Sequence, residues 1–176
     1  KDVANFVGEP IAVVFAETLD EAKEGAEKVK VDYKVLKAVV DPAEAMKSEA
    51  IHDGVDKNLC YDWLLGDRKA VDEAFAKADK IIKVDLINNR LVPNAMEPRA
   101  CVVDYNTASE EITLYTTSQN PHLSRLVMSA FGGVAPENKL RVVAPDVGGG
   151  FGSKINVYNE EIVCSWASKK IERPIK

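Results

Sequence analysis

The hydrophobic and polar positions of the chain predict helices and strands in mixed order. Short runs that are apolar throughout, or that alternate with polar residues, are typical of strands, whereas apolar residues at every third or fourth position are typical of helices. Strands are predicted at residues 11–16, 31–35, 80–88, 100–105, 111–117 and 140–144. Helices are predicted at about residues 19–30, 69–78, 121–131 and 157–170, with a short helix from residue 42. We therefore expect an α+β protein.

Several of the predicted helices carry capping signals at their first residues. Thr18 is followed three positions later by Glu21, which is the pattern of a capping box. Asp41 precedes Pro42, and aspartate suits the N-cap while proline suits the first turn. The polar and irregular segment 48–58 is predicted to be a linker.

Composition and charge exclude several classes of protein. The chain has 176 residues, 46% of them hydrophobic, and a net charge of −5 without a basic stripe, so nucleic-acid binding is not expected. No apolar run approaches the ~18 residues of a membrane span. The three cysteines form no Cys-x-x-Cys pair, which argues against a zinc site, an iron–sulfur cluster or a disulfide framework. Three buried small side chains in a reducing, cytoplasmic protein are the expectation.

A glycine-rich segment at residues 146–154 follows the predicted strand 140–144 and precedes a helical pattern. Loops between a strand and a helix often hold anionic groups on backbone N–H donors. The segment is not a P-loop, because Lys154 follows Ser153 instead of glycine, and its glycine spacing also breaks the dinucleotide fingerprint. On spacing alone, a ligand-binding loop and a flexible turn both remain open.

Four segments in order resemble a known family. They are 7–14 (Val-Gly-Glu-Pro-Ile-Ala-Val-Val), 94–100 (Asn-Ala-Met-Glu-Pro-Arg-Ala), 117–122 (Thr-Ser-Gln-Asn-Pro-His) and 148–154 (Gly-Gly-Gly-Phe-Gly-Ser-Lys). Together they resemble the large, molybdenum-binding subunit of the molybdenum hydroxylases, the group of xanthine dehydrogenase, aldehyde oxidoreductase and carbon monoxide dehydrogenase. Ser153 stands where the family most often has glycine.

The resemblance implies a domain organisation. Residues 1–50 would be an α/β hammerhead domain truncated at its N-terminus, and residues 51–176 the first part of a mixed α/β molybdopterin-binding domain. Because members of the family are several times longer, we expect the chain to be a fragment, a trimmed product or the product of a split gene.

The resemblance also assigns roles to five residues. Gln119 matches the glutamine that hydrogen-bonds an oxo ligand of molybdenum. Gly149, Gly150, Phe151 and Gly152 match the loop whose backbone and aromatic ring surround the metal and its pterin. None of the five is expected to coordinate the metal. No catalytic residue is expected in this segment, because the family's glutamate base lies beyond residue 176.

Other polar residues near these segments have more ordinary expectations. Glu97 and Arg99 flank Pro98 in a non-helical segment and suggest an ion pair with each other. Lys154 could reach a phosphate, although a surface lysine is the plainer interpretation. His122 follows Gln119 closely and either lines the rim of the site or is a surface group.

The implied activity of the complete enzyme is hydroxylation of aldehydes, carbon monoxide or N-heterocycles with oxygen from water. Its cofactors would be molybdopterin cytosine dinucleotide in the large subunit and FAD and iron–sulfur clusters on partner subunits. The chain alone, without the remaining part of the large subunit, is expected to be inactive. The alternative is a non-catalytic module whose glycine-rich loop binds a nucleotide or another subunit.

Overall fold

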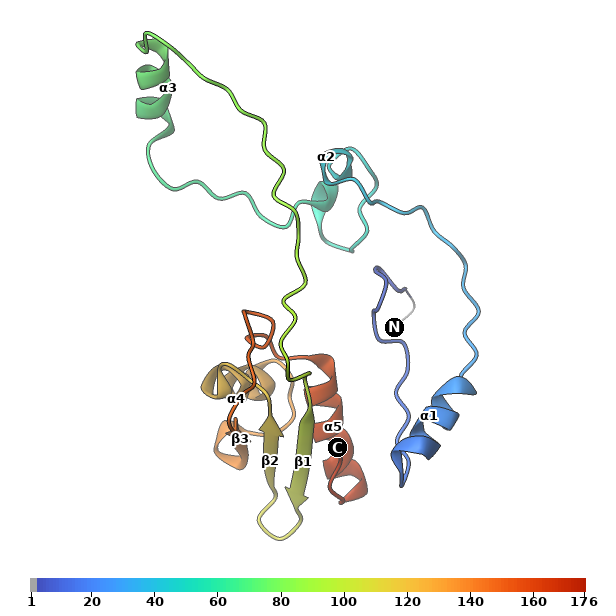
Figure 1. Cartoon of the computed structure of the whole chain (residues 1–176). Coiled ribbons are helices and arrows are strands. Elements are labelled where there is room, and N and C mark those ends of the chain that lie inside the picture. The colour runs from blue at the N-terminus through green and yellow to red at the C-terminus, as the bar shows by residue number, and fades with distance from the viewer. Residues whose placement is uncertain (1–2) are drawn as a thin grey trace. The chain divides into compact units, whose positions relative to one another are not determined.

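The computed structural model describes residues 3–176, and the chain divides into two compact units with the boundary between Asp85 and Leu86 (Figure 1). The first unit contains α1 (Leu19–Glu27), α2 (Pro42–Ala45), the 3₁₀ turn η1 (Asp56–Asn58) and α3 (Arg68–Ala76). The second contains β1 (Cys101–Asn106), β2 (Glu111–Thr116), α4 (Pro121–Ala130), the 3₁₀ turn η2 (Glu137–Lys139), β3 (Leu140–Val143) and α5 (Asn159–Ile171).

The helices of the first unit begin where the capping signals predict. The hydroxyl of Thr18 accepts a hydrogen bond from the N–H of Glu21, and the Glu21 carboxylate accepts one from the N–H of Thr18. The Asp41 side chain accepts from the N–H of Ala43 at the start of α2. These bonds satisfy donors that the first turn of a helix would otherwise leave unpaired.

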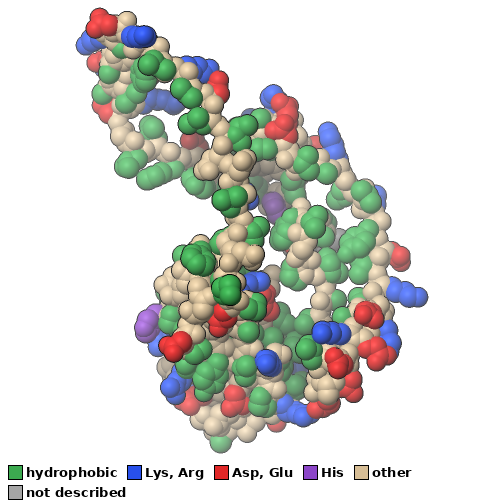
Figure 2. Space-filling model, in the orientation of Figure 1, with side chains coloured by type: hydrophobic (Ala, Val, Ile, Leu, Met, Phe, Trp, Pro, Cys, Tyr) green, Lys and Arg blue, Asp and Glu red, His purple; other side chains and the backbone are tan. Residues whose placement is uncertain are grey.

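Three predicted strands are wrong. Residues 11–16, 31–35 and 80–88 are extended, but within residues 3–176 they join no sheet. Their apolar side chains are largely exposed, as at Val35 with 90% exposure, and the space-filling view shows such side chains on the surface (Figure 2). An extended segment becomes a strand only when a neighbour satisfies its backbone groups, and these segments have apolar patterns without such a neighbour.

The predicted linker at residues 48–58 is more ordered than expected. The side chain of Asn58 accepts a hydrogen bond from the N–H of Ile51 and donates to the carbonyl oxygens of Ala45 and Glu49. The half-buried amide of Asn58 therefore holds this irregular segment together. Asparagine can do this because its side chain carries both a donor and an acceptor.

The second unit is a three-stranded sheet in the order β1-β2-β3 with two helices (Figure 1). β1 and β2 pair antiparallel, and their turn is held by the Asn106 side chain, which accepts from the N–H groups of Ala108 and Ser109. β2 and β3 pair parallel, with α4 in the connection between them. The strands and helices predicted after residue 99 are thus confirmed to within a few residues.

The core of the second unit follows the alternation of β1 and β2. Val103, Ile112 and Leu114 are completely buried on one face, where they meet Met128 of α4 and Leu140 of β3. α5 packs against β1 and β2, and it buries small residues such as Ser165 and Ala167 that allow a close approach. The structure is therefore a mixed α/β arrangement with a small sheet.

Candidate functional site

The sheet places two candidate segments at the same edge. Gln119 lies three residues beyond the carboxyl end of β2, and the glycine-rich loop follows the carboxyl end of β3. Because these two strands are parallel neighbours, both segments leave the sheet on the same side. The carboxyl ends of parallel strands are where α/β proteins commonly bind ligands.

Gln119 and the loop are in direct contact. The side-chain oxygen Oε1 of Gln119 accepts hydrogen bonds from the backbone N–H of Gly152, at 3.1 Å, and from that of Lys154, at 3.2 Å. The Gln119 N–H donates to the carbonyl oxygen of Lys154 at 2.8 Å. Sequence analysis expected these residues to share a site, and the structure brings them together.

These bonds fix which end of the Gln119 amide faces the loop. Only the carboxamide oxygen can accept, so the Nε2 group is left to donate elsewhere. Within residues 3–176, Nε2 donates to no protein atom. A neutral donor is therefore available at the edge of the sheet.

Gly150 is required by packing against Gln119. A Cβ atom on Gly150 would lie 2.2 Å from Oε1 and 2.5 Å from Cδ of Gln119, far inside normal contact. Gly148 is similarly restricted, since a Cβ there would lie 2.6 Å from Cβ of Glu97. Because they lack a Cβ atom, Gly150 and Gly148 allow the side chains of Gln119 and Glu97 to approach the loop backbone closely.

The loop itself presents further donors. Gly149 N–H donates to Val147 and Gly152 N–H to Gln119, so neither of these two groups is available to a ligand. In the part of the chain that the structure describes, the N–H groups of Gly150 and Phe151 donate to no protein acceptor. Together with Nε2 of Gln119, they form a donor set without titratable groups.

Phe151 lies at the tip of the loop in a strained conformation. Its φ of 51° is in the left-handed region, which costs a non-glycine residue about 1–2 kcal/mol. Its side chain is 74% exposed, and its ring edge lies beside Gly149. An exposed aromatic ring held in this way can form one side of a ligand site.

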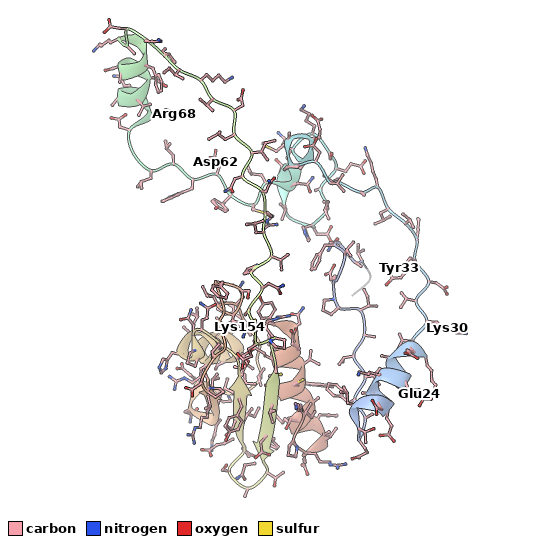
Figure 3. All side chains as sticks on the ribbon, viewed as in Figure 1. Glu24, Lys30, Tyr33, Asp62, Arg68 and Lys154 are labelled. Carbon is pink, nitrogen blue, oxygen red and sulfur yellow. The ribbon has the colours of Figure 1, made fainter. Side chains whose placement is uncertain are left out.

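The expected pair between Glu97 and Arg99 is wrong, and so is the expectation of a surface position for Lys154. Lys154 is 2% exposed, and Figure 3 shows it in the second unit. Its Nζ donates to the carboxylate and to the carbonyl oxygen of Glu97, both at 2.9 Å. The hydrogen bonds from Lys154 and from the Gly148 N–H hold the pKa of Glu97 below its usual range.

Arg99 has different partners. Its guanidinium pairs with Glu160 at 2.9 Å and lies 3.4 Å from the ring centroid of Tyr158. Glu97 therefore binds the glycine-rich loop, whereas Arg99 binds residues at the start of α5. His122 is exposed on α4 and forms no part of these contacts.

The enclosed space beside these residues is small. A cavity of ≈ 30 Å³ lies between Arg99, Thr116, Lys154, Tyr158 and their neighbours. Sites for drug-sized ligands have volumes of about 300–1,000 Å³. This cavity is therefore too small to enclose a drug-sized ligand.

The cysteines depart from the expectation of three buried side chains. Cys60 is exposed, whereas Cys101 of β1 and Cys164 of α5 are half-buried against the core. The interaction between these two neighbouring thiols raises the pKa of Cys101 and lowers that of Cys164. Among residues 3–176, no three histidine, cysteine or acidic side chains gather so as to hold a metal ion. No helix described in the structure is long and apolar enough to cross a membrane.

Known proteins resemble this chain over nearly its whole length. The family "Molybdopterin cofactor-binding domain" matches residues 51–176. The carbon monoxide dehydrogenase large chain of Hydrogenophaga pseudoflava is 34% identical over 98% of this chain and 23% of its own length. The nicotine 6-hydroxylase large subunit of Paenarthrobacter nicotinovorans is 32% identical over 100% of this chain and 21% of its own length.

A solved structure is also similar to this chain. Reconstituted carbon monoxide dehydrogenase from Oligotropha carboxidovorans matches 89% of this chain and 21% of its own chain, with a TM-score of 0.79 and 34% identity. The chain thus spans about a fifth of the length of each of these three relatives.

Proposed function

Because the chain belongs to the family of molybdopterin cofactor-binding domains, we propose that residues 117–154 form one wall of a molybdenum cofactor site in an oxidoreductase. The enzyme would hydroxylate an aldehyde, carbon monoxide or an N-heterocycle with oxygen from water. Support comes from relatives named as carbon monoxide dehydrogenase and nicotine 6-hydroxylase, which are aligned over this segment.

The observation that carries the proposal is the donor set around Gln119. Its Nε2, with the N–H groups of Gly150 and Phe151, lacks protein acceptors within the described residues. Such donors fit the oxygen and sulfur atoms of a molybdopterin cofactor, because they stabilise negative charge without titrating or coordinating the metal. When bound, the cofactor supplies the two-electron oxidation and the oxygen transfer.

The residues of this chain would therefore bind and orient. Gln119 donates a hydrogen bond to an electronegative atom of the cofactor, Gly149 and Gly152 shape the loop, and Phe151 walls the site beside it. The chain holds no group proposed as a catalytic base. The small cavity beside the site agrees with other polypeptide segments completing the enclosure.

The wider organisation belongs to the same proposal. Residues 1–50 would form part of a hammerhead domain, and residues 51–176 the start of the cofactor-binding domain. The cofactor would be the cytosine dinucleotide form, and electrons would leave to iron–sulfur and flavin subunits in the cytoplasm. Within the first segment, Gly25 of α1 lies close to the extended stretch 11–16, because a Cβ on Gly25 would lie 2.8 Å from the Val14 side chain.

Metal analysis of the complex tests the proposal. The chain is purified from its native host with the polypeptides that accompany it, and molybdenum is measured by elemental analysis and cytidine monophosphate after acid hydrolysis. Stoichiometric amounts of both are expected, with a loss in Gln119→Ala. Asn120→Ala is the matched control, because Asn120 is exposed and its side chain makes no capping bond.

Two outcomes would contradict the proposal. A native complex without molybdenum rejects the cofactor site and favours a non-catalytic module. Molybdenum without cytidine monophosphate retains the site and rejects the dinucleotide form. The chain purified alone is expected to retain no stoichiometric molybdenum, because its site has only one wall.

A further inference from the structure

We propose that Lys154 is a positioning residue which, anchored by Glu97, holds the carboxamide of Gln119 in the orientation that leaves Nε2 free to donate. The inference rests on the proposed function, since these are the hydrogens that would reach the cofactor. It adds a specific task for two charged residues that are separated by 57 positions in the chain.

The backbone of Lys154 contacts Gln119 on two sides. Its carbonyl oxygen accepts from the Gln119 N–H, and its own N–H donates to Oε1 of the Gln119 side chain. One residue thus fixes both the main chain and the carboxamide of Gln119. The remaining bond to Oε1 comes from Gly152, two positions earlier in the same loop.

The side chain of Lys154 prevents this backbone from shifting. Nζ is buried and donates to two oxygen atoms of Glu97, one of the carboxylate and one of the backbone. A buried ammonium group strongly resists leaving its partners, because no water replaces them. The position of the Lys154 backbone is therefore coupled to that of Glu97.

Glu97 in turn holds both ends of the loop. The same carboxylate oxygen that accepts from Lys154 also accepts from the N–H of Gly148 at 2.7 Å. The Glu97 N–H donates back to the carbonyl oxygen of Gly148. The loop between residues 148 and 154 is closed by one carboxylate, and the donors of Gly150 and Phe151 lie between the two anchors.

Two roles have to be separated. If the charged pair only stabilises the fold, its loss lowers stability without a specific effect on Gln119. If it positions Gln119, its loss frees the carboxamide in a chain that is still folded. Gln119 is the only glutamine in the chain, so glutamine-selective ¹⁵N labelling gives one side-chain signal to follow.

The experiment measures the ¹⁵N order parameter of the Gln119 side-chain amide in the 176-residue chain by NMR. In the unsubstituted chain a rigid value near ~0.8 is expected, and in Lys154→Met a value below ~0.6, typical of flexible groups. Methionine retains the backbone groups that touch Gln119 and removes only the anchor. Lys154→Arg, which keeps the charge, is expected to recover part of the rigidity.

Arg125→Met is the matched control. It removes a cation paired with Glu137 at 2.7 Å in the same unit, and no contact joins that pair to Gln119. Its Gln119 order parameter is expected to equal that of the unsubstituted chain. An unchanged value in a folded Lys154→Met chain, or a mobile amide in the unsubstituted chain, overturns the proposal.

If Lys154→Met does not fold, Glu97→Asp decides by the same measurement. Aspartate keeps the charge but withdraws it by one methylene, so a fall in the Gln119 order parameter supports the proposal and an unchanged value rejects it. Since the measurement needs no cofactor, a rigid, Lys154-dependent amide in a protein that never binds molybdenum would reject only the proposed function.

Discussion

Replacing Gly150 with alanine should expel the Gln119 side chain from the loop. The new Cβ atom would lie 2.2–2.8 Å from three atoms of that side chain, Oε1, Cδ and Cγ. Gln119 is exposed and can swing into solvent, so the clash is relieved by losing its two hydrogen bonds. At about 1 kcal/mol for each bond, the unit should lose about 2 kcal/mol of unfolding free energy.

Gly152→Ala is the control that separates contact from backbone strain. Gly152 has a φ of 90°, yet a Cβ atom there meets nothing within 4 Å. Alanine at this position should cost about 1–2 kcal/mol through its left-handed conformation while leaving Gln119 in place. The two substitutions therefore have similar costs with different causes.

Urea denaturation and NMR distinguish these causes. Unfolding of the second unit is followed by the fluorescence of Trp166, with Trp63→Phe as the background so that one tryptophan remains. The Gln119 side-chain amide should become mobile in Gly150→Ala and stay rigid in Gly152→Ala. A stable Gly150→Ala chain with a rigid Gln119 amide would refute the packing argument.

Two further predictions concern the carboxylates of Glu97 and Glu161. The folded-state pKa of Glu97 is lowered, so the stabilisation from its contacts is present above the ordinary glutamate pKa, about 4.3, and is lost as the pH falls through the lower folded value. A ¹³C titration of Glu97 with a midpoint at or above 4.3 would contradict this ordering. Thr116→Val should cost about 2 kcal/mol in urea denaturation, because it removes the hydroxyl that donates to the buried Glu161 carboxylate. Thr113→Val on the other face of β2 is its control, and equal losses for both would contradict the assigned bond.

Sequence patterns were sufficient to predict those features that depend on residues a few positions apart in the chain. Thr18 and Glu21 lie three residues apart, and their capping box is present as predicted. The strands predicted at residues 100–105 and 111–117 are present as β1 and β2. The expectation that Gln119 and the glycine-rich loop share a site came from the resemblance to the family and not from a local pattern.

Local patterns could not identify interactions made between distant segments. Lys154 appeared to be a surface residue, since nothing near it in sequence indicates a partner, and its partner Glu97 is 57 positions away. Glu97 and Arg99 looked like a pair because they are close in the chain, but they bind Lys154 and Glu160. The segments 11–16 and 31–35 have strand patterns and no neighbouring strand among the described residues.

The sequence by itself determined the helices, the pairing strands of the second unit and the family, and the resemblance to that family proposed the residues of the candidate site. Only the tertiary structure decided that Gln119 turns its oxygen to the loop, that Gly150 makes room for it, and that Lys154 is buried against Glu97. The physical reason is the distance along the chain between the interacting residues. Helix caps and hydrophobic periodicity involve residues three or four positions apart, whereas these contacts depend on which strands lie side by side.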